Sequence, residues 1–355
     1  EPPYKPEYEQ RIGQEAAAQV EKQYKLYEDE EALARLKTIV NEIAQASDRP
    51  EVVYDVRILD TDEVNAFSLP GGIVYATRGL LEDVQSDHEL AGVLAHEIAH
   101  NCTYDALIQA ERNKDLFTGS MAAAIAAILL GGSSETVSTV LVAGEYVRQS
   151  VLGGYSIDME TAADAHAIEY LLRTSYNPVG LLTFMERLAA EYRGNAQAVD
   201  PGVFQTHPLP PARVADLKRA LAAAGVDLNP RATTNWERPA VAQVEVEGAS
   251  ITQVVLQQQV IFKVLVPGPC AETVQARAER IVERLTAVMA EGLQRYEVRV
   301  ENNAGNPTVE ARGKKILTVY PEDAEAQGAE QMGIALHAAE AIKLALRMEE
   351  LERYW

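Results

Sequence analysis

Cysteine, long hydrophobic runs and positive charge are all scarce in this sequence. Two cysteines among 355 residues exclude a disulfide framework, although Cys102 and Cys270 leave room for a single bridge. The longest apolar run, Met121–Leu130, is about half of the roughly 20 residues that a helix needs to cross a bilayer. The sequence therefore predicts no transmembrane helix, and it leaves association with a membrane by other means open.

Positive charge is outnumbered, because 32 Lys and Arg residues face 53 Asp and Glu residues, for a formal charge of −21 at pH 7. Such a chain repels a nucleic-acid backbone, and no Lys/Arg stripe offers a local basic footprint, so no nucleic-acid partner is expected. The 47% hydrophobic and 24% charged residues form a normal globular balance. The chain opens Glu1-Pro2-Pro3 without Met, as expected of a mature domain whose leader has been removed.

Periodicity changes character at about residue 229. Before it, three short strand patterns lie at 52–59, 65–69 and 73–77. Helical patterns surround them at 8–45, 106–172, 179–192 and 212–224. After it, strand patterns lie at 241–246, 254–266, 296–300, 308–311 and 316–320. Helical patterns lie at 271–293, which is amphipathic, and at 321–347. We therefore expect an α+β protein: a mainly helical domain with a small β-sheet over 1–228, a linker over 229–240, and a separate α/β module over 241–355.

One short motif carries chemistry: His96-Glu97-Ile98-Ala99-His100 matches H-E-x-x-H within a helical pattern. Residues four apart share a helix face, so His96 and His100 can reach one metal ion. Glu97 lies one step round the helix, beside the metal, where it can accept a proton from water that the metal activates. The motif predicts one zinc ion per chain, with Glu97 as the catalytic base.

Zinc in a catalytic site needs a third protein ligand and one open position. The metzincin pattern would require Gly at position 103 and His at 106, but Thr103 and Ala106 stand there and exclude it. A carboxylate from a later helix is the other source. Glu160 and Asp164 are four residues apart and share a face, so one can bind the metal while the other accepts the outer N–H of a ligand imidazole.

A family resemblance chooses between these two carboxylates. Asn65–Leu81 resembles the segment before H-E-x-x-H in the gluzincin family of HtpX, BepA, mitochondrial Oma-type and CAAX-prenyl proteases. His96–His100, Glu160-x-x-Ala163-Asp164, and Thr206-His207-Pro208 followed by Arg213 match that family in order and spacing, closest to the periplasmic BepA-like members. The resemblance covers roughly residues 8–225. It implies a zincin fold, Glu160 as the third ligand and Asp164 as the partner behind the ligands.

The sequence also departs from the family. Ile157 stands where the family often has Arg, and Asp105 stands where it often has His. Neither position is a ligand, so the expected metal site is unchanged. The tetratricopeptide tail of BepA is absent, and the α/β module that replaces it carries no functional signal.

Together these features predict a zinc metalloendopeptidase that hydrolyses unfolded or misassembled polypeptides. The resemblance implies an extracytoplasmic, envelope-associated location. Asn65, Ala66, Phe67 and Ser68 are expected to form a sheet edge on which an extended substrate pairs through its backbone, the alternative being a core strand. The rival function is a latent or autoinhibited metalloprotein that acts as a chaperone-like or scaffold protein through its C-terminal module. The oligomeric state is not predicted.

Two further segments have alternative interpretations. His207 lies on a loop followed by prolines, which restrict its backbone. Its imidazole can donate an N–H to the oxyanion of the reaction, or it can fill the open zinc position and silence the enzyme. Gly119–Gly154 joins the two metal-bearing helices, and its Gly pairs fit either a mobile flap or an ordinary buried helix pair.

Overall fold

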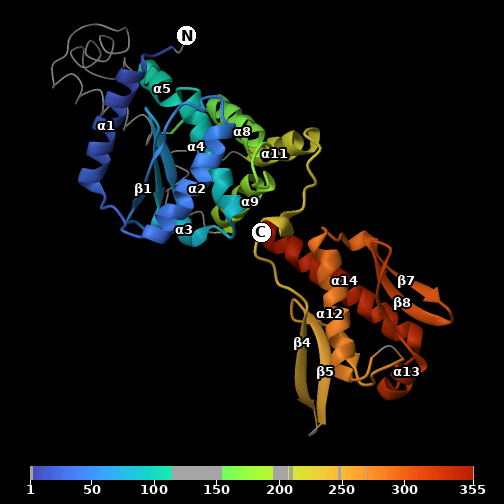
Figure 1. The fold of residues 1–355 in the computed structure, drawn as a ribbon. Helices are drawn as coiled ribbons and strands as arrows, with labels where there is room; N and C mark the ends of the chain where they lie inside the picture. The colour runs from blue at the N-terminus through green and yellow to red at the C-terminus, as the bar shows by residue number, and fades with distance from the viewer. Residues whose placement is uncertain are drawn as a thin grey trace. The chain divides into compact units, whose positions relative to one another are not determined.

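The computed structural model describes residues 3–113, 154–194, 207, 211–246, 249–269 and 271–354. The chain divides into two compact units, Glu1–Leu228 (unit 1) and Asn229–Trp355 (unit 2), which Figure 1 colours along the sequence. Unit 1 is mainly helical with one small sheet, and unit 2 is a separate body containing β-strands, so the expected α+β class is confirmed. None of the helices in the described ranges has the length and apolar character needed to cross a bilayer. The flap predicted over 119–154 lies outside these ranges, apart from Gly154.

Unit 1 surrounds a three-stranded sheet with helices. Its elements are α1 (Pro6–Gln23), α2 (Glu30–Ala46), β1 (Asp55–Leu59), β2 (Ala66–Leu69), β3 (Ile73–Thr77), α3 (Arg78–Asp83), α4 (Asp87–Cys102), α5 (Asp105–Asn113), α8 (Ile157–Leu171), α9 (Val179–Gly194) and α11 (Pro211–Ala223). The helical pattern expected over 8–45 is thus two helices. The segment between them pairs with the sheet through Leu26 and Leu59, and Asp29 then caps α2 by accepting from the N–H of Ala32.

The sheet has the order β1-β3-β2, with β1 parallel and β2 antiparallel to the central strand. Strand β2 is therefore an edge strand, and it contacts α4. Gly71 and Gly72, in the turn between β2 and β3, have positive φ values of 78° and 84°, which glycine adopts without strain. At Gly13 of α1 a Cβ atom would meet the carbonyl oxygen of Pro70 at 1.9 Å, so glycine permits α1 to pack on this turn.

Helix α4 is the centre of unit 1. It contacts β2 and helices α2, α5, α8 and α9, and its residues from Glu89 to Cys102 are all buried. Figure 1 shows it between the sheet and the helices α8 and α9. The hydroxyl of Ser86 accepts from the N–H of Glu89 and caps the start of the helix. Cys102, at its end, forms no disulfide with a described residue, and Cys270 lies outside the described ranges. A helix buried on all sides holds its polar side chains in fixed positions, as a site requires.

Unit 2 consists of two antiparallel three-stranded meanders, each followed by helices. Its elements are a 3₁₀ turn η2 (Pro230–Ala232), β4 (Ala240–Val246), β5 (Ala249–Leu256), β6 (Gln259–Val264), α12 (Val274–Ala290), a second 3₁₀ turn η3 (Arg295–Glu297), β7 (Val298–Asn303), β8 (Asn306–Ala311), β9 (Lys314–Thr318), α13 (Pro321–Gln327) and α14 (Gln331–Tyr354). Helix α12 packs on its own meander and on β9, while α14 packs on its own meander and on β6. The order of a meander followed by a long helix therefore occurs twice around one core.

Two boundaries in unit 2 differ from the sequence expectations. The strand pattern over 254–266 is a hairpin of β5 and β6, which turns at Gln257 and Gln258 with φ values of 50° and 60°. Such turns usually carry Asn or Gly, so the two glutamines gave no turn signal. The helix expected over 321–347 is α13 and α14, because Gly328 ends α13 in the left-handed conformation.

The residues expected to be a linker begin unit 2. Arg231 donates to both carboxylate oxygens of Glu349 on α14, and its guanidinium also donates to the carbonyl oxygens of Met289 and Leu293. These contacts attach the start of the segment to the helices of unit 2.

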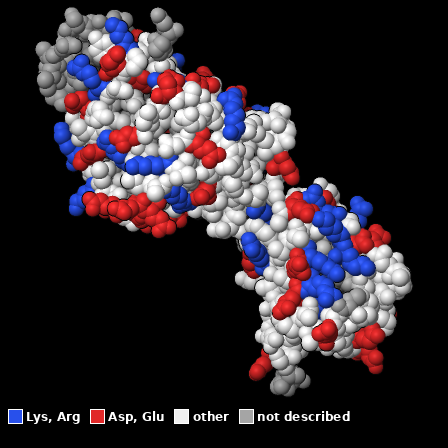
Figure 2. All heavy atoms as spheres, viewed as in Figure 1, with Lys and Arg blue, Asp and Glu red and all other residues white. Residues whose placement is uncertain are grey.

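Charge is distributed unevenly between the units. Unit 1 contains 35 of the 53 acidic side chains but only 18 of the 32 basic ones. Figure 2 shows acidic side chains spread over the visible face of unit 1 and basic side chains gathered on unit 2. The negative charge of the chain therefore resides mainly in unit 1, where it raises the local concentration of cations.

Candidate metal centre

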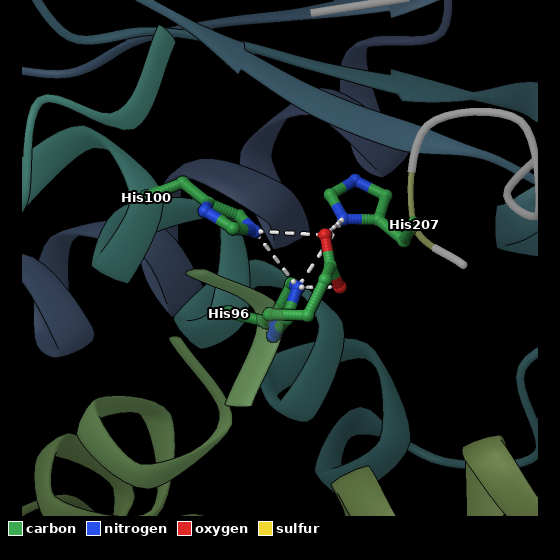
Figure 3. Close-up of side chains that lie close together, drawn as sticks. His96, His100 and His207 are labelled. Atoms are coloured by element: carbon green, nitrogen blue, oxygen red, sulfur yellow. Dashed lines mark hydrogen bonds and ion pairs between the residues drawn. The ribbon is translucent and has the colours of Figure 1, made fainter. Parts of the chain in front are cut away.

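Four buried side chains in unit 1 converge on one point. His96 and His100 come from α4, Glu160 from α8, and His207 lies before α11; one ligand atom of each lies within 4.8 Å of all the others. Figure 3 shows the three imidazoles pointing toward one another. The predicted ligands His96, His100 and Glu160 are thus brought together, although 60 residues separate His100 from Glu160.

The spacing of the ligand atoms fits a tetrahedral ion. The Nε2 atom of His96 lies 3.1 Å from Nε2 of His100 and 3.3 Å from Oε2 of Glu160, and Nε2 of His100 lies 3.5 Å from Oε1 of Glu160. Ligand bonds of 2.0–2.1 Å in a tetrahedron place the ligand atoms roughly 3.3–3.4 Å apart. The three side chains therefore have the separation that one small metal ion requires.

A carboxylate holds each ligand imidazole from behind. Nδ1 of His96 lies 2.9 Å from Oδ1 of Asp164, and Nδ1 of His100 lies 2.7 Å from Oδ2 of Asp105. A carboxylate at Nδ1 favours the tautomer whose Nε2 lone pair is free for a metal. Asp164 thus lies where the resemblance suggested, behind a ligand.

Asp105 is a functional residue that the sequence analysis missed. It appeared there only as a departure from the family, without a role. The chain after α4 reverses at Tyr104, whose φ of 60° is left-handed, and Asp105 then begins α5. The available signal was an acidic residue five positions after His100. Helical periodicity does not predict the turn at Tyr104 that brings Asp105 close to His100.

Arg213 was also missed, although the family match included it. From the first turn of α11, its Nη1 contacts Oε2 of Glu160 at 2.6 Å, while Nη2 and Nε contact the two oxygens of Asp164 at 2.8 and 3.0 Å. One guanidinium therefore orients both carboxylates of α8. Only 1% of Arg213 is exposed, so the contact lies inside the protein, where bidentate pairing fixes geometry.

The charges around the centre favour a cation. Four buried carboxylates face the single guanidinium of Arg213; they belong to Glu97, Asp105, Glu160 and Asp164. Burial raises the pKa of Glu160, but the positive charges and hydrogen bonds of the neighbouring imidazoles outweigh it and bring the pKa well below its usual range. Buried negative charge is costly without compensation. Two imidazoles and a carboxylate with this surplus of negative charge fit a divalent metal ion.

Glu97 lies beside the ligands. Burial raises its pKa, whereas the charge of His207 and then those of the other imidazoles lower it, and the net shift is below the usual value. Its Oε1 atom lies 3.1 Å from Nε2 of His207, and its Oε2 atom has no hydrogen-bond partner among the described residues. An ionised, buried carboxylate with an open acceptor atom has the properties of a general base.

His207 approaches the ligands and Glu97 at once. Its Nδ1 lies 3.3 Å from Nε2 of His96 and 3.0 Å from Oε1 of Glu160, while its Nε2 contacts Glu97. Burial lowers its pKa, but the charges of Glu97 and Glu160 raise it to about 10. The imidazole therefore lies at the fourth vertex of the ligand group.

The segment predicted to pair with substrate lies next to the motif helix. The hydroxyl of Ser68 in β2 donates to the carbonyl oxygen of Glu97 at 2.8 Å. The N–H of Thr77 donates to the carbonyl oxygen of Asn65. In an antiparallel ladder, successive residues of a strand direct their backbone N–H and C=O groups to opposite sides. The backbone groups of Ala66 and Ser68 therefore point away from β3, toward the edge of the sheet. The side chains of Asn65, Ala66, Phe67 and Ser68 are all buried.

Comparison with known proteins identifies the family of unit 1. Residues 30–221, which include every residue of the centre described above, match the model of peptidase family M48. The chain belongs to this family. The resemblance noted in the sequence is thus confirmed, and it makes the chain a member of a family of metallopeptidases. Residues 253–349 of the M48 chain match a second model, described only as a domain of unknown function.

Several curated relatives of this M48 chain are named as proteases. It is 31% identical over 167 residues to the beta-barrel assembly-enhancing protease of Escherichia coli O157:H7, covering 45% of the chain and 33% of the relative. It is 27% identical over 174 residues to metalloprotease YcaL of Escherichia coli K12, covering 49% and 64%. It is 25% identical over 225 residues to mitochondrial metalloendopeptidase OMA1 of Schizosaccharomyces pombe, covering 62% and 63%. The chain thus spans about a third of the first relative's length.

Proposed function

We propose that the protein is a zinc-dependent metalloendopeptidase in which His96, His100 and Glu160 hold one zinc ion. The observation that carries the proposal is the near-tetrahedral spacing of their three ligand atoms, with the open carboxylate oxygen of Glu97 beside them. Zinc is the metal most commonly bound by the two imidazoles of an H-E-x-x-H helix together with a carboxylate from another helix. Family membership and the names of the relatives support peptide hydrolysis as the reaction.

The proposed reaction assigns a task to each residue around the centre. A bound zinc ion would polarise the scissile carbonyl and acidify the attacking water. Glu97 accepts the proton of that water and passes it to the leaving amine. Asp105 and Asp164 keep the two imidazoles oriented, and Arg213 keeps Glu160 oriented. The chain thus supplies a rigid frame in which only Glu97 exchanges protons.

We further propose unfolded or misassembled polypeptides as substrates. The outward backbone groups of Ala66 and Ser68 lie on the strand whose Ser68 contacts the motif helix, so an extended segment added to this edge would run past the centre. Backbone pairing accepts many sequences but requires an extended chain, which folded proteins rarely expose. The name of the beta-barrel assembly-enhancing relative supports an extracytoplasmic envelope as the setting.

Casein hydrolysis tests the proposal directly. We expect the purified protein to degrade casein, a chelator to abolish the activity, and added zinc to restore it. Glu97→Gln should retain zinc, because Glu97 is not a ligand, and should lose about 10²- to 10⁴-fold in turnover. Hydrolysis that resists the chelator, or a Glu97→Gln variant with wild-type turnover, would contradict the mechanism. A zinc-loaded protein that cleaves nothing but suppresses aggregation of casein would support the scaffold alternative.

A latent state of the peptidase is favoured by one observation, the position of His207. Its imidazole contacts two of the proposed ligands and the proposed base together. We propose that it fills the fourth position in a closed state, which substrate must displace before Glu97 can act. The position of the ring fits the silencing ligand, which requires the ring to release the proton that Glu97 and Glu160 favour, whereas the protonated ring fits the N–H donor.

His207→Ala distinguishes the roles. We expect turnover on a short peptide to rise and zinc to be retained, because three ligands remain. His166→Ala on α8, whose imidazole pairs with Asp48 at 3.3 Å, is the matched control and should leave turnover unchanged. A fall in turnover for His207→Ala would support the N–H donor instead, and no change would refute both roles.

A further inference from the structure

Tyr155 is a side chain of the centre that neither the motif nor the family resemblance singled out. It lies two residues before α8, and its ring stacks on the imidazole of His100 with centroids 4.1 Å apart and an interplanar angle of 21°. Its centroid is 5.8 Å from that of His207, and 4% of the residue is exposed. Tyr155 is therefore adjacent to the space that the His207 imidazole fills.

The hydroxyl of Tyr155 has no hydrogen-bond partner among the described residues. An unpaired buried hydroxyl costs free energy in the folded protein, so its retention calls for a partner in another state.

The centre is rich in acceptors and poor in donors. Its carboxylates accept hydrogen bonds, the Nδ1 atoms of His96 and His100 are engaged by Asp164 and Asp105, and Arg213 is engaged by Glu160 and Asp164. Peptide hydrolysis places negative charge on the scissile carbonyl oxygen, which a preorganised donor in a dry site stabilises strongly. Once His207 is displaced, Tyr155 is the described side chain that can still offer an unengaged O–H.

We propose that the hydroxyl of Tyr155 donates a hydrogen bond to the scissile carbonyl oxygen of a bound polypeptide as that oxygen becomes negative. The inference rests on the proposed peptidase function and adds a catalytic residue to it. The stack on His100 holds the ring in place before substrate arrives, so the donor needs little reorganisation. The bond forms with substrate, which accounts for a hydroxyl that has no partner among the residues the structure describes.

Tyr155→Phe removes the hydroxyl and keeps the stacked ring. We expect kcat on a peptide substrate to fall about 100-fold with KM unchanged, as for the loss of one donor to an oxyanion. The affinity of a phosphinic peptide, which mimics the negative tetrahedral species, should fall by the same factor in calorimetry. Zinc content should stay at the wild-type value, and the unfolding temperature should stay equal or rise because an unpaired buried hydroxyl has been removed.

Tyr170→Phe is the matched control. Tyr170 is fully buried on α8, and its hydroxyl donates to Oδ2 of Asp48 at 2.8 Å. This variant should show the opposite pattern, a lower unfolding temperature with unchanged kcat and inhibitor affinity.

Wild-type kcat and inhibitor affinity in Tyr155→Phe would overturn the inference while leaving the peptidase proposal intact. A fall in kcat together with a lower unfolding temperature or lost zinc would also overturn it, because it would assign Tyr155 a structural role. A wild-type protein without peptidase activity would overturn both proposals.

Discussion

Both units bury charged side chains, but the candidate metal centre of unit 1 arranges them differently from the Arg277–Asp323 pair of unit 2. In unit 2, Arg277 and Asp323 form two contacts of 2.7 Å, and the remaining guanidinium donors reach the carbonyl oxygens of Val266 and Thr318. The charges of Arg277 and Asp323 therefore compensate each other, which makes them a closed pair. In unit 1, imidazoles and carboxylates converge on one point, and one oxygen of Glu97 remains unpaired. Buried charges that pair fully with one another stabilise a fold. Buried charges that converge on one point and leave a polar atom unpaired are typical of a binding site.

The largest effect on folding should come from breaking the closed pair of unit 2. Arg277→Met leaves Asp323 buried without its partner, so we expect the free energy of unfolding to fall by about 3–5 kcal/mol. Hydrogen exchange measured by mass spectrometry should locate the loss of protection in unit 2. Arg280→Met, at an exposed position of the same helix, should change stability by less than about 0.5 kcal/mol. Equal effects of the two substitutions would show that the pair does not hold the unit together.

A smaller effect, on metal affinity rather than on folding, is expected from substituting the carboxylates that contact the proposed ligand imidazoles of unit 1. Asp105→Asn keeps the shape of the side chain but removes the charge that orients His100, so zinc affinity should fall roughly 10- to 100-fold while the fold persists. Competition with a chromogenic chelator measures the affinity. Asp164→Asn should act similarly on His96, with an added loss from its contacts with Arg213. Asp158→Asn, at an exposed position of α8, is the control. Wild-type affinity in Asp105→Asn would remove that residue from the metal centre.

The comparison also shows which parts of the molecule the sequence could predict. The helical pattern around the H-E-x-x-H motif predicted α4, and the four-residue spacing of Glu160 and Asp164 placed them on one face of α8. Each of these signals lies within one helix. The turns at Gln257–Gln258 and at Gly328 were missed, because neither interrupts the hydrophobic pattern strongly enough to be distinguished from a continuing strand or helix.

The rest of the centre is built from contacts through space. Arg213 reaches Glu160 across 53 residues of sequence, and Tyr155 stacks on His100 across 55, so no periodicity links them. Asp105 lies close in sequence, but only the left-handed turn at Tyr104 brings it behind His100. The family resemblance supplied the order of the motifs without the roles of these residues. Sequence patterns therefore predicted the residues that converge in the proposed metal centre, and the fold revealed the residues that contact them.

The central claim, that His96, His100 and Glu160 hold one zinc ion, is tested most directly by metal analysis of purified protein. We predict one zinc per chain in the wild-type protein and a sharp loss of zinc in Glu160→Ala, because Glu160 supplies the only negatively charged ligand of the proposed set. Glu169→Ala, an exposed position on the same helix, should retain full zinc. Full zinc stoichiometry in Glu160→Ala, or a wild-type protein that binds no metal, would contradict the account.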